Sequence, residues 1–174
     1  MPFDAERLRG LVRDVPDHPV AGVTFKDLTP LLADPTALTE VVEAIAEGVR
    51  CDLVAGIEAR GFVLAAPVAV ALGVGFVPVR KPGKLPWRTV RRAYDLEYGS
   101  DALEVHEDAV TQGQRVLVVD DVLATGGTAA AACGLLESIG ATVAGVSVLV
   151  ELAFLGGRAR LDGHHLTSLL TYEE

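Results

Sequence analysis

The residues best suited to chemistry lie between Val116 and Thr128, where a short apolar run ends in two acids and a glycine turn. From position 116 the sequence reads VLVVDDVLATGGT. The turn presents several backbone N–H groups, and a helix starting near Thr128 adds the partial positive charge of its N-terminus. The glycines allow close approach of the backbone, and both threonines offer hydroxyl donors. A phosphate group fits this environment without a nearby lysine.

The two acids, Asp120 and Asp121, repel a bare phosphate and therefore need a different ligand group. A phosphorylated sugar resolves the conflict, because the carboxylates accept hydrogen bonds from two ribose hydroxyls while the turn takes the 5-phosphate. The alternative is that Asp121 caps a turn and Thr128 caps a helix, which explains neither the acid pair nor the double glycine. A P-loop is excluded, because no Gly-Lys-Ser/Thr follows four spacers after a glycine.

The elements that must position this loop alternate between strand and helix patterns. Asp34 and Pro35 start an amphipathic helix that continues to Val49, with apolar residues on one face. Short apolar runs predict strands at residues 53–57, 74–79, 116–119 and 143–150, with helices at 62–72 and 128–139 between them. This order predicts an α/β fold with a doubly wound, mostly parallel sheet flanked by helices. Ligands bind beyond the carboxyl ends of such strands.

Two stretches do not fit this alternation. Prolines and glycines interrupt residues 1–33, so we expect irregular structure there. Residues 81–92, KPGKLPWRTVRR, combine Pro, Gly and cations, which predicts a mobile loop. Strand patterns follow at 94–98 and 103–105, with a turn at 99–101. No linker or repeat is visible, so we expect one domain over residues 1–174, with a core at 34–174 that carries a mobile loop at 81–98.

Composition narrows the function classes. The chain has 174 residues, as one ordinary domain does, and a net charge of −9. That charge argues against binding to nucleic acids or membrane surfaces, which are anionic. Cys51 and Cys133 lack metal-ligand spacing and are expected to be free thiols in a reducing compartment. Residues 62–79 are apolar but contain prolines and glycines, so we expect two buried elements there and a cytoplasmic protein.

The acid-acid-x-x-x-Thr-Gly-Gly-Thr segment is similar to the phosphoribosyl-pyrophosphate loop of type I phosphoribosyltransferases. Five further collinear blocks resemble the adenine phosphoribosyltransferase family: FKD at 25–27, EARGF at 58–62, RKPGKLP at 80–86, YDLEYG at 94–99 and VEL at 150–152. The blocks span roughly residues 22 to 172. The resemblance implies the type I fold with a small N-terminal hood over residues 1–33 that binds the base.

The implied reaction is purine salvage, in which adenine and 5-phosphoribosyl 1-pyrophosphate give AMP and pyrophosphate. The implied cofactor is Mg²⁺, held mainly by substrate and water with no direct protein ligand. The implied partners are these small molecules and a second copy of the chain in a homodimer.

The resemblance also assigns residues to the phosphorylated substrate. Arg60 matches a pyrophosphate-binding arginine, although an exposed surface arginine is the alternative. Arg80, Lys81 and Lys84 would add positive charge, unless they are only solvated loop cations. The implied contacts to phosphoribosyl pyrophosphate and AMP within the glycine turn come from Asp120, Asp121, Ala124, Thr125, Gly126, Gly127 and Thr128.

For the base, the resemblance assigns Glu97 to proton movement at the imidazole edge of adenine. Asp95 lies on the same face of the predicted strand, so the pattern alone does not choose between the two acids. Phe25 would stack on adenine, with Leu152 on the opposite side, unless Phe25 is a plain core residue. The implied readers of the Watson–Crick edge are backbone groups of Thr24 and Lys26.

Two other functions remain open. One is a phosphoribosyltransferase for a 6-oxopurine, which would need a donor to O6, and the stretch from Val150 to Leu152 offers none. The other is a regulator that senses phosphoribosyl pyrophosphate without turnover. Such a regulator has no need of Arg60 and Glu97, and the presence of both favours catalysis.

Overall fold

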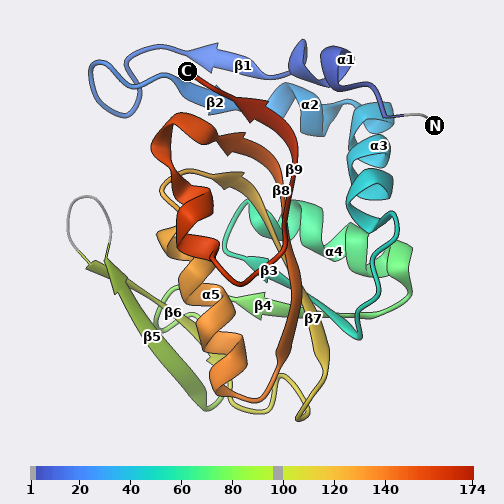
Figure 1. Cartoon of the computed structure of the whole chain (residues 1–174), viewed down its shortest axis with the longest axis vertical. Helices are drawn as coiled ribbons and strands as arrows, with labels where there is room; N and C mark the ends of the chain where they lie inside the picture. The colour runs from blue at the N-terminus through green and yellow to red at the C-terminus, as the bar shows by residue number, and fades with distance from the viewer. Residues whose placement is uncertain (1–2, 96–99) are drawn as a thin grey trace. The chain divides into compact units, whose positions relative to one another are not determined.

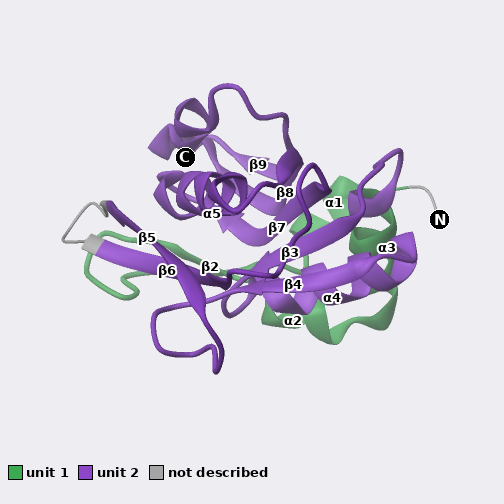
Figure 2. Cartoon of the chain, turned by 90° about the horizontal axis from the view of Figure 1, so that it is seen from below, with its two compact units in different colours: residues 1–44 green, residues 45–174 purple. Residues whose placement is uncertain are grey.

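The structure is a computed structural model that describes residues 3–95 and 100–174. The helices and strands labelled in Figure 1, with the two short 3-10 helices η1 and η2, are α1 (Ala5–Arg9), β1 (Arg13–Val15), β2 (Phe25–Asp27), α2 (Thr29–Ala33), α3 (Pro35–Ala46), β3 (Leu53–Ile57), α4 (Gly61–Leu72), β4 (Gly75–Val79), β5 (Thr89–Asp95), β6 (Ser100–His106), β7 (Arg115–Leu123), α5 (Gly127–Ser138), β8 (Thr142–Leu152), η1 (Ala153–Leu155), η2 (Gly157–Leu161) and β9 (Leu166–Tyr172). They fall into two compact units, residues 1–44 and 45–174, coloured separately in Figure 2.

The first unit is more regular than the sequence predicts. It contains two short helices and an antiparallel pair, β1 and β2, in which Val15 lies opposite Phe25. Lys26 Nζ lies 2.7 Å from a carboxylate oxygen of Asp14, across the same pair of strands. The expectation of irregular structure over residues 1–33 is therefore wrong for these elements. Each has only three to five residues, too few for a periodic pattern to be recognised among the prolines.

The second unit is built on a parallel sheet of five strands in the order β4-β3-β7-β8-β9. Strand β3 leads through α4 to β4 on one side, and β7 leads through α5 to β8 on the other. The predicted doubly wound α/β fold is confirmed, and β3 has the predicted bounds. Strand β9 has no counterpart among the predicted elements.

The two helices cover opposite faces of this sheet. Ala55 and Ile57 share a buried cluster with the alanine-rich side of α5. Gly56 points to the other face, where an added Cβ would meet the Cβ of Ala65 in α4 at 2.7 Å. A glycine is required there because strand and helix approach so closely. Burial on both faces explains why the central strands read as continuous apolar runs.

The hairpin of β5 and β6 corrects the prediction for residues 81–92. Strand β5 starts at Thr89, so the cations Arg91 and Arg92 lie in a strand. The hairpin stands beside α5 in Figure 1, and the Arg92 guanidinium lies so close to Gly134 that a Cβ there would be 2.7 Å from Cζ. Strand β6 is also longer than the predicted 103–105. The predicted strand at 94–98 and the turn at 99–101 fall partly on residues 96–99, outside the described part of the chain.

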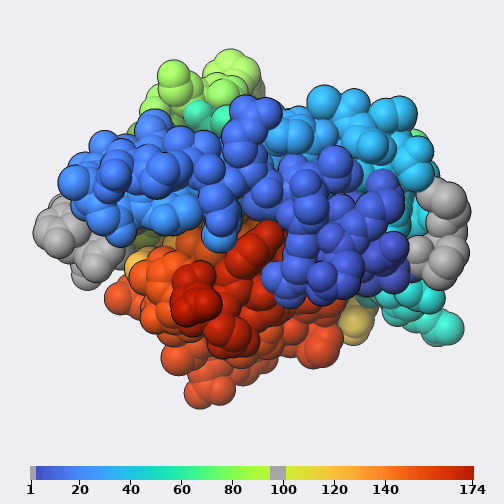
Figure 3. Space-filling model, turned by 90° about the horizontal axis from the view of Figure 1, so that it is seen from above, coloured from blue at the N-terminus to red at the C-terminus, as the bar shows by residue number. Residues whose placement is uncertain are grey.

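Three further features bear on the sequence predictions. Cys51 and Cys133 are free thiols, Cys133 being buried. No helix among residues 3–95 and 100–174 has the length and apolar character needed to cross a membrane. The chain ends at the surface, where Glu173 and Glu174 are exposed beside strand β9, drawn in red in Figure 3.

Candidate active site

A cavity of about 240 Å³ opens at the carboxyl ends of β3 and β7. These neighbouring strands lead to helices on opposite faces of the sheet, so their ends diverge and leave a crevice between them, the usual ligand position in open α/β sheets. All of the cavity belongs to the second unit. Its lining comprises Glu58, Ala59, Arg60, Lys81, Tyr94, Leu103, Asp120, Asp121, Val122, Leu123, Ala124, Thr125, Gly126, Thr128, Ala129 and Val148.

The glycine turn between β7 and α5 forms one wall of the cavity. Gly126 adopts φ = 82°, the left-handed conformation that glycine tolerates best. Gly127 then starts α5 and is not part of the lining, whereas Thr125 and Thr128 are. The cavity wall therefore combines the N-terminus of α5, whose N-cap residue Gly126 makes no side-chain cap, with two hydroxyl side chains, which suits an anionic group.

The two acids lie inside β7, not after its end as the sequence predicted. Strand pairing continues past them, with Asp120 opposite Val148 and Val122 opposite Val150 in β8. Asp121 is buried, and its Oδ2 lies 2.7 Å from Nε of Arg60. This oxygen makes no hydrogen bond of good geometry within the described part of the chain. Its partner is the guanidinium of Arg60, through the ion pair.

The charge state of Asp120 depends on this crowded environment. Burial raises the pKa of Asp120 well above its usual range, and the neighbouring carboxylate of Asp121 raises that pKa further. A backbone hydrogen bond from the Asp121 N–H, 2.9 Å long, and the positive charge of Arg60 act in the opposite direction. A ligand that donates hydrogen bonds or brings positive charge would relieve this strain between the acids.

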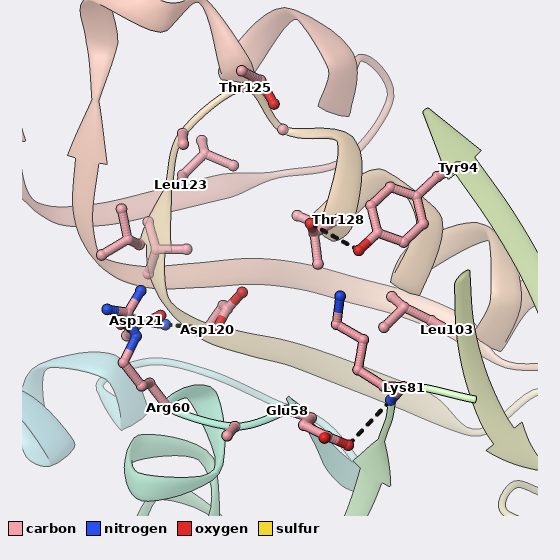
Figure 4. A pocket seen from close by; sticks show the side chains of 16 residues that line it. Glu58, Arg60, Lys81, Tyr94, Leu103, Asp120, Asp121, Leu123, Thr125 and Thr128 are labelled. Atoms are coloured by element: carbon pink, nitrogen blue, oxygen red, sulfur yellow. Dashed lines mark hydrogen bonds and ion pairs between the residues drawn. The ribbon is translucent and has the colours of Figure 1, made fainter. Parts of the chain in front are cut away.

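The predicted cations differ in their positions. Lys81 extends into the cavity, as Figure 4 shows, and forms an ion pair with Asp101. Arg80 instead donates from Nε to Glu58 at 2.8 Å, and it is not part of the lining. Lys84 is exposed and also outside the lining, but its carbonyl accepts a hydrogen bond from Arg80 at 3.1 Å. Of the four predicted cations, the structure thus brings Arg60 and Lys81 to the cavity.

Two polar residues of the lining, Glu58 and Tyr94, have no role among those predicted from the sequence. Glu58 follows β3 directly and accepts hydrogen bonds from Arg80 Nε and, at 3.1 Å, from the Lys81 N–H. Tyr94 reaches across from β5, and its hydroxyl lies 3.4 Å from Oγ1 of Thr128 (Figure 4). The position of Glu58 at a strand end was a usable signal. Nothing local in the sequence marks Tyr94, because its partner is 34 residues away.

The predicted base contacts are divided between the units. Thr24, Phe25 and Lys26 lie at β2 in the first unit, where the Phe25 ring packs edge-on against His18 with centroids 5.2 Å apart. Leu152 ends β8 in the second unit and is partly exposed. Glu97 lies outside the described residues. These assignments stay predictions.

The arrangement fits a ligand with an anionic end, vicinal hydroxyls and a second anionic group. The turn is suited to the first, the acid pair to the hydroxyls, and Arg60 with Lys81 to the last. The family model for the phosphoribosyl transferase domain matches residues 29–165. Fold, site and family model together define a phosphoribosyltransferase.

Individual relatives narrow this class. An adenine phosphoribosyltransferase of Thermobifida fusca is 60% identical over 163 residues, 92% of this chain and 93% of that protein. The crystal structure of adenine phosphoribosyltransferase from Thermoanaerobacter pseudethanolicus has a TM-score of 0.94 at 51% identity, covering 97% of this chain and 100% of that one. That of Giardia lamblia, complexed with 9-deazaadenine, has a TM-score of 0.91 at 37% identity, covering 98% and 99%. The chain belongs to the adenine phosphoribosyltransferase family.

Proposed function

We propose that this chain transfers the phosphoribosyl group of 5-phosphoribosyl 1-pyrophosphate to N9 of adenine, giving AMP and pyrophosphate in purine salvage. The observation that carries the proposal is the wall formed by Asp120, Asp121 and the turn to Thr128, with Arg60 opposite. High identity to adenine phosphoribosyltransferases over almost the whole chain supports adenine as the acceptor.

In the proposed reaction the bond from sugar C1 to the pyrophosphate oxygen breaks, and a bond from C1 to adenine N9 forms. The turn holds the 5-phosphate, and Asp120 and Asp121 hold the ribose hydroxyls, which fixes C1 relative to the incoming base. Negative charge develops on the leaving pyrophosphate, where Arg60 and Lys81 neutralise it. Arg80 and Lys84 extend this positive region outside the cavity.

The base side of the reaction rests on the family resemblance. Phe25 and Leu152 would enclose the adenine ring, and backbone groups of Thr24 and Lys26 would read its Watson–Crick edge. Glu97 would accept the proton from the imidazole N–H as N9 attacks C1. Recognition by these backbone groups disfavours a 6-oxopurine, because no side-chain donor is assigned to its O6.

The residues at the cavity fit a Mg²⁺ ion that arrives with the substrate. No group of three or more His, Cys, Asp and Glu side chains suited to a metal occurs within residues 3–95 and 100–174. Asp120 and Asp121 nevertheless bring two neighbouring carboxylates to the cavity lining, which suit water or hydroxyls that an ion polarises. When bound, Mg²⁺ would supply positive charge to the pyrophosphate oxygens and ribose hydroxyls.

We further propose a homodimer in the cytoplasm. Helix α4 is apolar on every side, and its outer residues Val63 and Val70 are 45% and 80% exposed. Exposed apolar surface of this kind is typical of a subunit interface. The free thiols Cys51 and Cys133 suit a reducing compartment.

A panel of bases tests the activity. The chain is incubated with phosphoribosyl pyrophosphate, Mg²⁺ and either adenine, hypoxanthine, guanine or xanthine, and pyrophosphate release is followed. We expect release with adenine alone. Release with a 6-oxopurine would replace the proposed acceptor, and binding of phosphoribosyl pyrophosphate without release on any base would indicate a sensing regulator.

A further inference from the structure

The glycine turn has a backbone neighbour outside the βα unit that forms it. Gly157, at the start of η2, lies against the turn so closely that a Cβ on Gly126 would be 2.2 Å from the Gly157 carbonyl oxygen. In the reverse direction, a Cβ on Gly157 would be 2.1 Å from the carbonyl oxygen of Ala124. Backbone therefore packs on backbone behind the turn. Whatever fixes Gly157 also limits how far the turn can retreat from a ligand.

The residue that follows Gly157 is anchored by a forked ion pair. Arg158 donates from Nε to Oε1 of Glu151 at 2.9 Å and from a terminal nitrogen to Oε2 at 2.5 Å. Ser168 in β9 also donates to Oε2, at 2.6 Å. The hydrogen bonds from Arg158, followed by that from Ser168, lower the pKa of Glu151, so the carboxylate stays ionised. Such bidentate pairs fix orientation as well as distance.

The acid of this pair is buried and lies beside the turn. Glu151 is only 4% exposed and belongs to the interior strand β8, where it pairs with Leu123 of β7 and Thr171 of β9. Leu123 is the last residue of β7 before the turn begins at Ala124. Strand β8 therefore supports the turn in two ways. It pairs with Leu123 at the end of β7, and its Glu151 binds Arg158, the residue next to Gly157.

We propose that Glu151 and Arg158 are positioning residues, which hold Gly157 behind the glycine turn and thereby set the affinity for the 5-phosphate of the substrate. The inference rests on the proposed function, because it assigns the turn to that phosphate. Neither side chain lines the cavity. Their effect passes through backbone contact alone, and it acts on binding of the sugar phosphate more than on the chemical step.

A purely structural pair would behave differently. Arg158 is 54% exposed but Glu151 is buried, so loss of the pair lowers Tm in either case, and a purely structural pair would change Tm alone. Removal of Arg158 leaves the buried Glu151 carboxylate without its cation, which loosens the segment after β8. In a positioning role this loosening changes the Michaelis constant for phosphoribosyl pyrophosphate at temperatures where the protein remains fully folded.

The test compares Arg158→Ala and Arg158→Lys with Arg160→Ala, an exposed arginine of the same short helix. We expect Arg158→Ala to raise the Michaelis constant for phosphoribosyl pyrophosphate about tenfold, with kcat within about twofold, because a turn that is held less firmly loses affinity for the substrate without a change in the chemical step. Lysine keeps the positive charge but cannot make both hydrogen bonds to Glu151, so the Michaelis constant of Arg158→Lys should lie between those of the parent and Arg158→Ala chains. Arg160→Ala should match the parent chain. A fall in Tm with unchanged Michaelis constants would overturn the positioning role.

Binding of ribose 5-phosphate, measured by calorimetry, separates this inference from the proposed function. If the parent chain binds ribose 5-phosphate and the Arg158→Ala chain binds it equally well, the positioning role is wrong. If the parent chain binds neither this ligand nor phosphoribosyl pyrophosphate, the proposed function fails first. Should Arg158→Ala not fold, Glu151→Gln keeps the side-chain shape and removes the charge, and weaker binding by that variant is the expected result. Unchanged binding by Glu151→Gln would equally refute the role.

Discussion

Arg60 and Asp121 join the ends of two neighbouring strands, because Nε of Arg60 lies 2.7 Å from Oδ2 of Asp121. The arginine follows β3 and is 51% exposed, whereas the aspartate is buried in β7. The same guanidinium that would grip pyrophosphate thus already neutralises an acid of the proposed ribose site. Pyrophosphate binding by Arg60 would therefore change how well the charge of Asp121 is neutralised.

Arg60→Ala is expected to lower kcat/KM roughly 10- to 100-fold, the range that losing a charged hydrogen bond of about 1.5–3 kcal/mol implies. Arg60→Lys should recover only part of the activity, because an ammonium cannot bind two phosphate oxygens in one plane. Steady-state kinetics with Arg50→Ala as the control, an exposed arginine outside the cavity, check this. Equal activity of the alanine and parent chains would exclude Arg60 from the site.

Asp120→Asn is expected to stabilise the free protein at pH 8 and to weaken substrate binding. Burial and Asp121 raise the pKa of Asp120, so the folded state holds this proton more tightly than the unfolded state. The stability from Asp120 is therefore full below about pH 3.9 and is lost as pH rises through the raised value. Each 1 kcal/mol recovered raises Tm by roughly 2–4 °C.

Thermal unfolding of the parent and Asp120→Asn chains at pH 5 and pH 8 tests the predicted direction of this pH dependence. The difference in Tm between the two chains should be larger at pH 8. Identical differences at both pH values would mean that Asp120 has no raised pKa in the folded state. The Michaelis constant for phosphoribosyl pyrophosphate should rise in the same variant, because an amide accepts fewer hydroxyl hydrogen bonds than a carboxylate.

Glu97→Ala is expected to reduce turnover by roughly 10²- to 10⁴-fold, the usual contribution of a general base. Binding of phosphoribosyl pyrophosphate should change far less. Asp95→Ala serves as the matched variant, because both acids lie on one face of the predicted strand. Steady-state turnover and direct binding are compared for both chains. Equal losses in turnover and binding for Glu97→Ala, or a larger loss of turnover for Asp95→Ala, would reassign the base.

Cys133 is expected to be inert to thiol reagents at pH 8 in the folded protein. Burial raises the pKa of its thiol to about 12, so almost no thiolate forms. Burial also raises the pKa of Cys51, which is partly exposed and should react slowly. Colour development with a chromogenic disulfide should report one slow thiol when folded and both in denaturant. A Cys51→Ser chain that still reacts when folded would contradict this assignment.

The sequence predicted the central layers of the second unit well, because burial on both faces leaves a continuous apolar run. Strand β3 is one example, and helix α4 begins within one residue of its prediction. Strand β7 was predicted too short, since the acids at 120 and 121 interrupt the apolar pattern without interrupting the backbone ladder. Strand β9 was missed because polar residues alternate irregularly with leucines in its sequence, LTSLLTY.

The site was predictable where its residues are neighbours in sequence. The turn from Asp120 to Thr128 is one continuous segment, so its ligand chemistry could be inferred directly. Glu58 and Tyr94 reach the cavity through tertiary contacts with Arg80 and Thr128, which no local pattern encodes. The backbone approach of Gly157 to Gly126 is equally invisible in the sequence, since an isolated glycine has many possible reasons.

The placement of Asp120 and Asp121 inside the ladder has a consequence for recognition. Backbone pairing to β8 on either side of Asp121 orders this stretch when the protein folds, so the entropy of ordering it is lost before any ligand arrives. In the proposed complex the two carboxylates would therefore select the spacing of the two ribose hydroxyls. A sugar that lacks one of these hydroxyls would leave a carboxylate without its donor, because the paired strand holds both acids in place.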